Sequence, residues 1–389
     1  MSERKVQPYD ILVGRLFSLF LSINILNIVF SLIGIFSAIS HFLPYILAIL
    51  FIFYILMHQR EFGKIWRIFI VMIVWIGGMY FISALINNNL SYELFSRMYW
   101  TLLYCIPLGC SFLFVNDIEL VIDSTKSATI FCTLCAVLVF LIFIFNKNFL
   151  TSPDYSMGLG FALLYPTLFH IKECGRNRKY IIISLLDVSI LTLYGSRSQL
   201  LCVAIFVFLL YYFRNSILTQ KGFSFTFLCA FFAIIFIVLY KDILQALISF
   251  LDTIGVHSRS LSYFLERTTY TGRELVWVGA IKLIKLKCIT GWGIGLNTTE
   301  VKGSLPHNIV LELLLHYGII FGLILVIGML LLIYKGVFSK NGKRSEASLI
   351  LFVTGFIPLL LSSSYLIWPQ FWILIFTCIA KTRNKQQKI

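Results

Sequence analysis

The sequence predicts an all-α, polytopic membrane protein, a single transmembrane domain (1–389) of about twelve helices. Hydrophobic residues make up 59% of the 389 residues and charged residues only 13%, whereas a soluble globular chain carries about 25% charged residues. Apolar runs follow one another with short connectors, and each approaches the roughly 20 residues that span a bilayer. Because lipid offers no hydrogen bonds to the backbone, such runs are expected to be helices.

The apolar runs define the expected helices in order. The first follows the charged N-terminus and is too long for the apolar core of a signal peptide, so we expect it to be retained. With the N-terminus cytoplasmic, the inside connectors are basic, as at 172–179 and 335–344, except for the acidic connector 116–126. The predicted helices are 11–38, 41–57, 67–86, 98–115, 128–145, 156–172, 180–196, 198–213, 222–240, 308–334, 347–362 and 364–380.

The large polar stretch 241–307 follows the ninth helix and is predicted to face outward. Within it, 241–256 and 274–287 carry apolar stripes at helical spacing, so both are predicted to be amphipathic helices on the membrane surface. The glycines of 291–295 have neither the preceding strand nor the following lysine of a nucleotide-binding loop. We interpret them as flexible backbone beside a substrate.

Composition also excludes several other functions. The nine cysteines lie mostly in apolar runs and form no disulfide framework, and Cys132 and Cys135 are interpreted as core packing. The six histidines are too scattered to indicate a metal site. The net charge of +15 resides in connectors, which indicates membrane topology rather than nucleic-acid binding.

Arg197 is the first candidate site residue. It lies in the tight turn 194–198 between two predicted helices, on the outer face, with Ser196 as the expected N-cap of the second helix. A cation is unfavourable at a helix N-terminus, but helix amides and a guanidinium together bind phosphate groups. The alternative is an arginine that reaches the membrane interface.

Arg273 lies in the polar turn before the second amphipathic helix, and Arg259 and Arg267 precede it. Four outward arginines, with Arg197, could converge on a polyanion. The alternative is that each is a solvated loop charge.

His307 and Asn308 begin the tenth predicted helix at the membrane edge. A neutral imidazole is a natural general base near neutral pH, and the alternative is that the pair caps the helix. Further along, Glu312 is a costly charge in a membrane helix, and it either pairs with His316 or forms a second polar site. Gly318 is expected on the same helix face as His307, and with Gly322 as a close-packing pair.

Three stretches, in this order, resemble the superfamily of O-antigen ligases and of O-antigen and capsular polysaccharide polymerases. They are Gly195-Ser-Arg-Ser-Gln-Leu200, Thr271-Gly-Arg-Glu-Leu-Val-Trp277 with Gly291-Trp-Gly-Ile-Gly295, and His307-Asn-Ile-Val-Leu-Glu312 running to Gly318. The resemblance covers about residues 150–335, and its specificity lies in the joint order of short motifs.

The resemblance implies a metal-independent glycosyltransferase without a cofactor, in the bacterial cytoplasmic membrane, that acts at its outer, periplasmic face. The donor would be an undecaprenyl-pyrophosphate-linked glycan and the acceptor a second glycan, with membrane lipids and a chain-length regulator protein as partners and no nucleic acid. Arg197 and Arg273 would hold the pyrophosphate, and His307 would activate the acceptor hydroxyl. Asn308, Glu312, Arg259 and Arg267 would bind substrate.

The same motifs favour a polymerase over a ligase. Ligases often show His-Asn, nine residues and Gly-x-x-Gly, whereas here Gly318 is followed by Gly322, with Phe321 at the expected glycine position. Two further alternatives stay open: a transporter or flippase, and a peptidoglycan polymerase that would need an outer-loop carboxylate among Asp252, Glu266 and Glu274. The long loop lies after the ninth helix rather than the sixth, which argues against a two-halved transporter.

Overall fold

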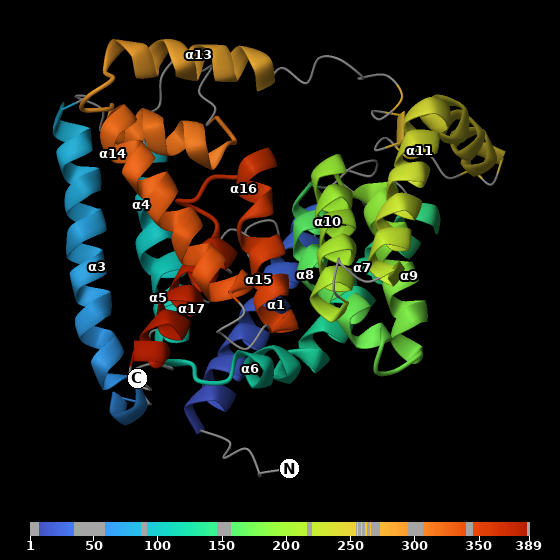
Figure 1. Cartoon of the computed structure of the whole chain (residues 1–389), viewed down its shortest axis with the longest axis horizontal. Coiled ribbons are helices and arrows are strands. Elements are labelled where there is room, and N and C mark those ends of the chain that lie inside the picture. The colour runs from blue at the N-terminus through green and yellow to red at the C-terminus, as the bar shows by residue number, and fades with distance from the viewer. Residues whose placement is uncertain are drawn as a thin grey trace. The chain divides into compact units, whose positions relative to one another are not determined.

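The computed structural model describes residues 8–34, 59–86, 92–145, 157–215, 220–253, 255, 258, 261–262, 265, 273–294, 306–339 and 345–386, and these residues form helices and their connectors (Figure 1). Five described stretches are long and apolar enough to cross a membrane: Pro8–Ile33, Arg67–Leu85, Lys126–Phe145, Arg197–Arg214 and Ile309–Phe338. The all-helical prediction is therefore confirmed for the described residues, and the five candidate spans agree with a polytopic membrane protein. The predicted helix 41–57 lies outside the described residues, and the count of twelve stays a prediction.

The chain divides into two compact units. Unit 1 contains Met1–Phe17, Tyr45–Ser124 and Tyr270–Ile389, and unit 2 contains Ser18–Pro44 and Thr125–Thr269. Helix α1 (Pro8–Ile33) contributes its first residues to unit 1 and the rest to unit 2.

Unit 1 is built around α17 (Pro369–Gln386), which packs on α5 (Ile106–Ser111) and α15 (Glu346–Gly355). Helix α13 (Arg273–Leu286) packs on α14 (Ile309–Ile333), and Figure 1 shows α13 running across the end of that helix. The remaining elements of the unit are α3 (Gln59–Ile86), α4 (Tyr92–Tyr99), η1 (Trp100–Cys105), η2 (Phe112–Phe114), α6 (Ile118–Ser124), η5 (Tyr334–Phe338) and α16 (Ile357–Leu361).

Two predicted helices of unit 1 are divided in the structure. The predicted helix 98–115 is α4, the π-helical η1, α5 and η2, and the predicted helix 347–362 is α15 followed by α16. Pro107 and Pro358 lie in the first turns of α5 and α16. Because proline has no amide hydrogen, it is tolerated at a helix start and disrupts a helix interior. The final helix begins at Pro369, so 362–368 is an irregular segment instead of helix.

Unit 2 contains α7 (Lys126–Phe145), α8 (Met157–Cys174), α9 (Lys179–Tyr194), α10 (Arg197–Arg214) and α11 (Gln220–Thr253). Helix α8 packs against α7, α9 and α10. The interior of unit 2 holds a polar cluster that the sequence pattern does not reveal. One carboxylate oxygen of Asp187 accepts a hydrogen bond from Thr133 Oγ1 at 2.7 Å, and the other lies 2.7 Å from His170 Nδ1. Helix α11 is unbroken, so residues 241–253 continue a long helix instead of forming a separate surface helix.

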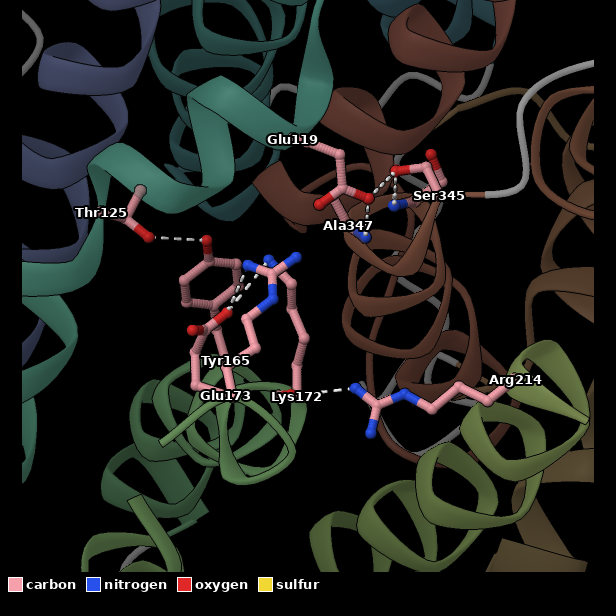
Figure 2. Close-up of polar contacts among 10 residues, drawn as sticks. Glu119, Thr125, Tyr165, Lys172, Glu173, Arg214, Ser345 and Ala347 are labelled. Atoms are coloured by element: carbon pink, nitrogen blue, oxygen red, sulfur yellow. Dashed lines mark hydrogen bonds and ion pairs between the residues drawn. The ribbon is translucent and has the colours of Figure 1, made fainter. Parts of the chain in front are cut away.

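Polar contacts hold connectors in place within each unit (Figure 2). In unit 1, Glu119 Oε1 accepts hydrogen bonds from Ser345 Oγ at 2.6 Å and Ala347 N at 3.2 Å, at the start of α15. In unit 2, Arg214 donates to the carbonyl of Lys172 at 3.0 Å. These bonds give Glu119, an acidic residue of connector 116–126, a structural role beside Ser345, the N-cap of α15.

Candidate functional site

The candidate site of unit 1 begins where the chain enters α14. His307 has a φ of 51°, the left-handed conformation, and it is the only described residue other than glycine with a positive φ. Such a conformation costs on the order of 1–3 kcal/mol in a non-glycine residue and is concentrated at functional sites. The strain is maintained by the neighbours on both sides of His307.

Asn308 is the neighbour that begins the helix. Its Oδ1 accepts hydrogen bonds from Val310 N at 3.0 Å and Leu311 N at 3.2 Å, which makes it the N-cap of α14. The structure therefore confirms the capping interpretation for Asn308. With Oδ1 occupied, its amide NH₂ is the group that remains to meet a substrate, and the predicted substrate-binding role stays a prediction.

Helix α13 holds the other side of His307. Trp277 Nε1 donates to the carbonyl of Pro306 at 2.8 Å. One turn earlier, Arg273 is the first residue of α13, and its guanidinium donates to Ser362 Oγ at 3.2 Å. The indole bond joins α13 to the residue before His307, so Arg273 and His307 are positioned by the same pair of helices.

Electrostatics keep the imidazole of His307 neutral. Burial lowers the pKa of His307 below its ordinary value, and the nearby positive charge of Arg273 lowers this pKa further. The Nδ1 atom of His307 is buried and has no hydrogen-bond partner among the described residues. A neutral imidazole with an unpartnered nitrogen beside a fixed cation can accept a proton while the cation binds an anion.

Helix α14 is broken at Gly318, where φ is 76°. The glycine-rich stretch and the residues just before it fill the break. Trp292 N donates to Leu315 O at 2.9 Å, and Gly293 N donates to His316 O at 2.9 Å. In the other direction, Ile319 N donates to Cys288 O at 2.6 Å. These bonds satisfy backbone groups that the break leaves without helical partners. The stretch is thus bonded structure, which corrects its interpretation as flexible backbone.

The break also corrects the predicted role of the two glycines of α14. His307 precedes the helix and Gly318 interrupts it, so helical periodicity does not place them on one face. A Cβ at Gly322 would lie 2.9 Å from Leu314 Cα. Gly322 therefore permits close contact between the two segments of α14, rather than between different helices.

Glu312 and His316 do not bond to each other, contrary to one of the two expectations. Glu312 Oε1 accepts from Ser364 Oγ, and His316 Nδ1 hydrogen-bonds the Tyr365 hydroxyl at 2.9 Å. Both side chains are buried, and within the described part of the chain Glu312 Oε2 and His316 Nε2 have no hydrogen-bond partner. The irregular segment 362–368 thus contacts Arg273, Glu312 and His316. Its apolar sequence predicts helix for residues 347–362 and 364–380, so this role of the segment could not be predicted.

Arg197 belongs to unit 2, where it is the first residue of α10. Ser196 is the N-cap, as predicted, and its amide donates to Gln199 Oε1 at 2.6 Å in a capping box. A Cβ at Gly160 of α8 would lie 3.1 Å from Gly195 Cα. The turn before Arg197 is therefore packed closely against α8.

The other predicted site residues are either outside the described residues or exposed. Arg259 and Arg267, and with them Glu266, lie outside the described residues. Asp252 and Glu274, the remaining carboxylates of the peptidoglycan-polymerase alternative, are exposed side chains. The structure thus positions Arg273, His307 and Asn308 together in unit 1, with Glu312 one turn further into α14.

Comparison with known proteins finds one family to which part of the chain is similar. Residues 182–327 match the family described as O-antigen ligase, a stretch that contains Arg197, Arg273 and His307. No curated protein and no solved structure matches the chain.

Proposed function

We propose that this chain, whose residues 182–327 carry an O-antigen ligase domain, polymerises undecaprenyl-pyrophosphate-linked repeat units into O-antigen or capsular polysaccharide. The family comprises membrane enzymes that transfer lipid-linked glycans, and the choice of a polymerase is our inference. The reaction is placed at the outer face of the cytoplasmic membrane, since the predicted topology directs the region of Arg273 and His307 outward.

The observation that carries the proposal is the neutral, partly buried His307 beside the Arg273 cation. Glycosyl transfer from a pyrophosphate donor needs a base for the acceptor hydroxyl and fixed positive charge for the leaving group. Unit 1 supplies the base just before α14 and the positive charge at the start of α13. The Trp277 hydrogen bond to Pro306 holds these two segments together.

The chemical step follows from these groups. His307 accepts the proton of the acceptor hydroxyl as its oxygen attacks the anomeric carbon of the donor glycan. The bond between that carbon and the pyrophosphate oxygen breaks, and its electron pair leaves with the polyprenyl pyrophosphate. Arg273 stabilises the negative charge that develops on this leaving group. By the family resemblance, Arg197 is assigned the same role, which its place at the N-terminus of α10 suits.

A host deletion tests the polymerase proposal against its alternative, the ligase. We expect loss of the glycan ladder with one repeat unit still attached to its acceptor. Long lipid-linked chains that accumulate without attached glycan would identify a ligase instead. An unchanged ladder on both carriers would contradict both activities.

Complementation of the deletion tests the site. Arg273→Ala is expected to reduce the rate of transfer by roughly 10²–10³-fold, the effect of removing one charge-stabilising donor. Lys285→Ala is the matched control, because it removes one exposed positive charge from the same helix. Equal activity of the two variants would remove Arg273 from the mechanism.

A further inference from the structure

Unit 1 contains an apolar groove of about 420 Å³ between α3 and the α4–η1 segment. Ile73 of α3 forms one wall, and Phe95, Met98, Tyr99, Leu102 and Leu103 form the other, with Ser96 as the polar contribution. The volume far exceeds that of a water molecule, and the lining offers a water almost no hydrogen bonds. The chemistry of the walls suits a hydrocarbon chain.

Two local features keep the groove open. Gly77 follows Ile73 by one turn of α3, and a Cβ at Gly77 would meet a single atom within 4 Å, Leu102 Cδ1 at 3.5 Å. The missing side chain therefore leaves space against Leu102. The opposite wall includes η1, a π-helical turn, and such turns are rare and frequently occur at functional sites.

The groove belongs to the part of unit 1 that faces lipid. On α3, Val74 and Trp75 next to Ile73 are each 68% exposed, and Phe81 is 63% exposed. In a helix that is long and apolar enough to span the membrane, exposed apolar side chains of this size contact lipid. A chain can therefore enter the groove directly from the bilayer.

Both walls are hydrogen-bonded to segments that hold the candidate site. From α3, Ser83 Oγ donates to the carbonyl of Ile294 at 2.8 Å, in the stretch that fills the break of α14. From η1, Thr101 Oγ1 donates to the carbonyl of Leu366 at 2.8 Å, in the segment whose Ser362 contacts Arg273. The elements that form the groove are thus hydrogen-bonded to the segments that position the cation proposed to bind the pyrophosphate.

We propose that this groove holds the polyprenyl chain of the lipid-linked donor, so that the chain is bound between α3 and η1 while the pyrophosphate is bound at Arg273. The inference rests on the proposed function. Each buried methylene strengthens the binding of a lipid chain, so several isoprene units in the groove give the enzyme a preference for long-chain donors.

Adjacent glycines of α3 provide the variant and its control. Gly77→Leu adds a side chain against Leu102 and fills the groove. Gly78→Leu makes the same change one residue later, where a Cβ would meet no atom within 4 Å. Both variants replace glycine in a helix by a better helix former, so they are expected to have the same effect on helix stability. The thermal unfolding midpoint of each variant measures that effect.

The full chain in phosphatidylethanolamine and phosphatidylglycerol nanodiscs is tested with undecaprenyl pyrophosphate and the shorter farnesyl pyrophosphate. We expect wild type and Gly78→Leu to prefer the long chain, and Gly77→Leu to lose about tenfold in affinity for it, or 1.4 kcal/mol, with farnesyl pyrophosphate unaffected. Equal binding of undecaprenyl pyrophosphate by both variants would overturn the groove assignment. Absence of binding by wild type would instead count against the proposed function.

A photoreactive group on the polyprenyl chain tests the wild-type protein without any substitution. The label is expected on residues 95–103, with excess undecaprenyl pyrophosphate reducing it and excess phosphatidylglycerol leaving it unchanged. Displacement by phosphatidylglycerol would assign the groove to bulk phospholipid and overturn the proposal, as would labelling confined to other segments.

Discussion

At the scale of single residues, function depends on how neighbours alter ordinary side chains. By residue type alone, His307 does not differ from the other histidines of the chain. In the structure its backbone is left-handed, its Nδ1 is buried, and burial and the adjacent Arg273 favour the neutral imidazole. In the proposed mechanism Arg273 serves two purposes, since its charge binds the pyrophosphate and also lowers the pKa of the neighbouring His307.

The lowered pKa of His307 predicts the pH dependence of transfer. The base must be neutral, so the rate should fall only when pH decreases through this lowered pKa, below the ordinary histidine value of about 6.5. Arg273→Gln removes the neighbouring charge and should move this acid limb to higher pH as well as slow the reaction. The measurement is the pH–rate profile of each enzyme. Lys285→Gln should leave the limb in place, and an unmoved limb in Arg273→Gln would separate the arginine from the base.

Asn308 provides a second prediction at this scale. Asn308→Ala removes the cap of α14 and should lower the free energy of unfolding by about 1 kcal/mol. Asn308→Asp keeps an oxygen acceptor for Val310 N and Leu311 N but loses the side-chain NH₂, so it should retain stability while it loses the contact predicted to bind substrate. Chemical denaturation and the transfer assay measure the two effects. A stable but inactive Asn308→Asp would show that the side-chain amide nitrogen contacts substrate.

At the scale of elements, α14 is two helical segments joined at a left-handed glycine. The first segment carries the site and is tied to α13 by the Leu283, Ile284 and Leu315 cluster and by the backbone bonds of Trp292 and Gly293. Lys287 Nζ lies 4.0 Å from the centre of the Trp292 ring, which adds a cation–π contact. The position of the site therefore depends on the break as much as on the helix.

Gly318→Ala tests the break. A Cβ at Gly318 would lie 2.2 Å from the carbonyl oxygen of Ile289, and alanine is disfavoured at a φ of 76° and a ψ of 175° by roughly 1–3 kcal/mol. We expect a lower thermal unfolding midpoint and loss of transfer activity. Gly328→Ala, in the same helix with no atom within 4 Å of the added Cβ, should keep both. A wild-type midpoint for Gly318→Ala would contradict the broken geometry.

At the scale of the whole molecule, the basic connectors predict which parts of the chain face the cytoplasm. Connector 172–179 is predicted inside and the region of α13 outside. The structure adds that Cys288, just after α13, is exposed and that Cys174 is partly exposed, whereas six others are buried: Cys105, Cys110, Cys132, Cys135, Cys202 and Cys378. These two native thiols can report on the two faces.

A membrane-impermeant maleimide applied to spheroplasts should label Cys288 and leave Cys174 unlabelled until the membrane is permeabilised. Cys288→Ser and Cys174→Ser identify the labelled site by mass. Labelling of Cys174 in sealed spheroplasts would invert the predicted topology, and with it the outer-face location proposed for the reaction.

The sequence alone determined the class of this protein and the identity of its candidate residues. Membrane helices follow from composition and run length, because each segment in lipid must form its backbone hydrogen bonds within itself. The Ser196 cap and the Asn308 cap were readable for the same reason, since a cap involves residues two or three positions apart. Arg197 and His307 stand out as polar residues at the ends of apolar helices, and Arg273 stands out through the motif that resembles the family.

Only the tertiary structure decided how the site of unit 1 is assembled. The partners of Arg273, Glu312 and His316 all come from 362–368, some 50 to 90 positions away in the chain. The break at Gly318 is stable because a distant glycine-rich stretch satisfies its backbone groups. Local periodicity carries no information about such long-range hydrogen bonds, which is why an uninterrupted tenth helix was predicted where the chain forms two segments and a site.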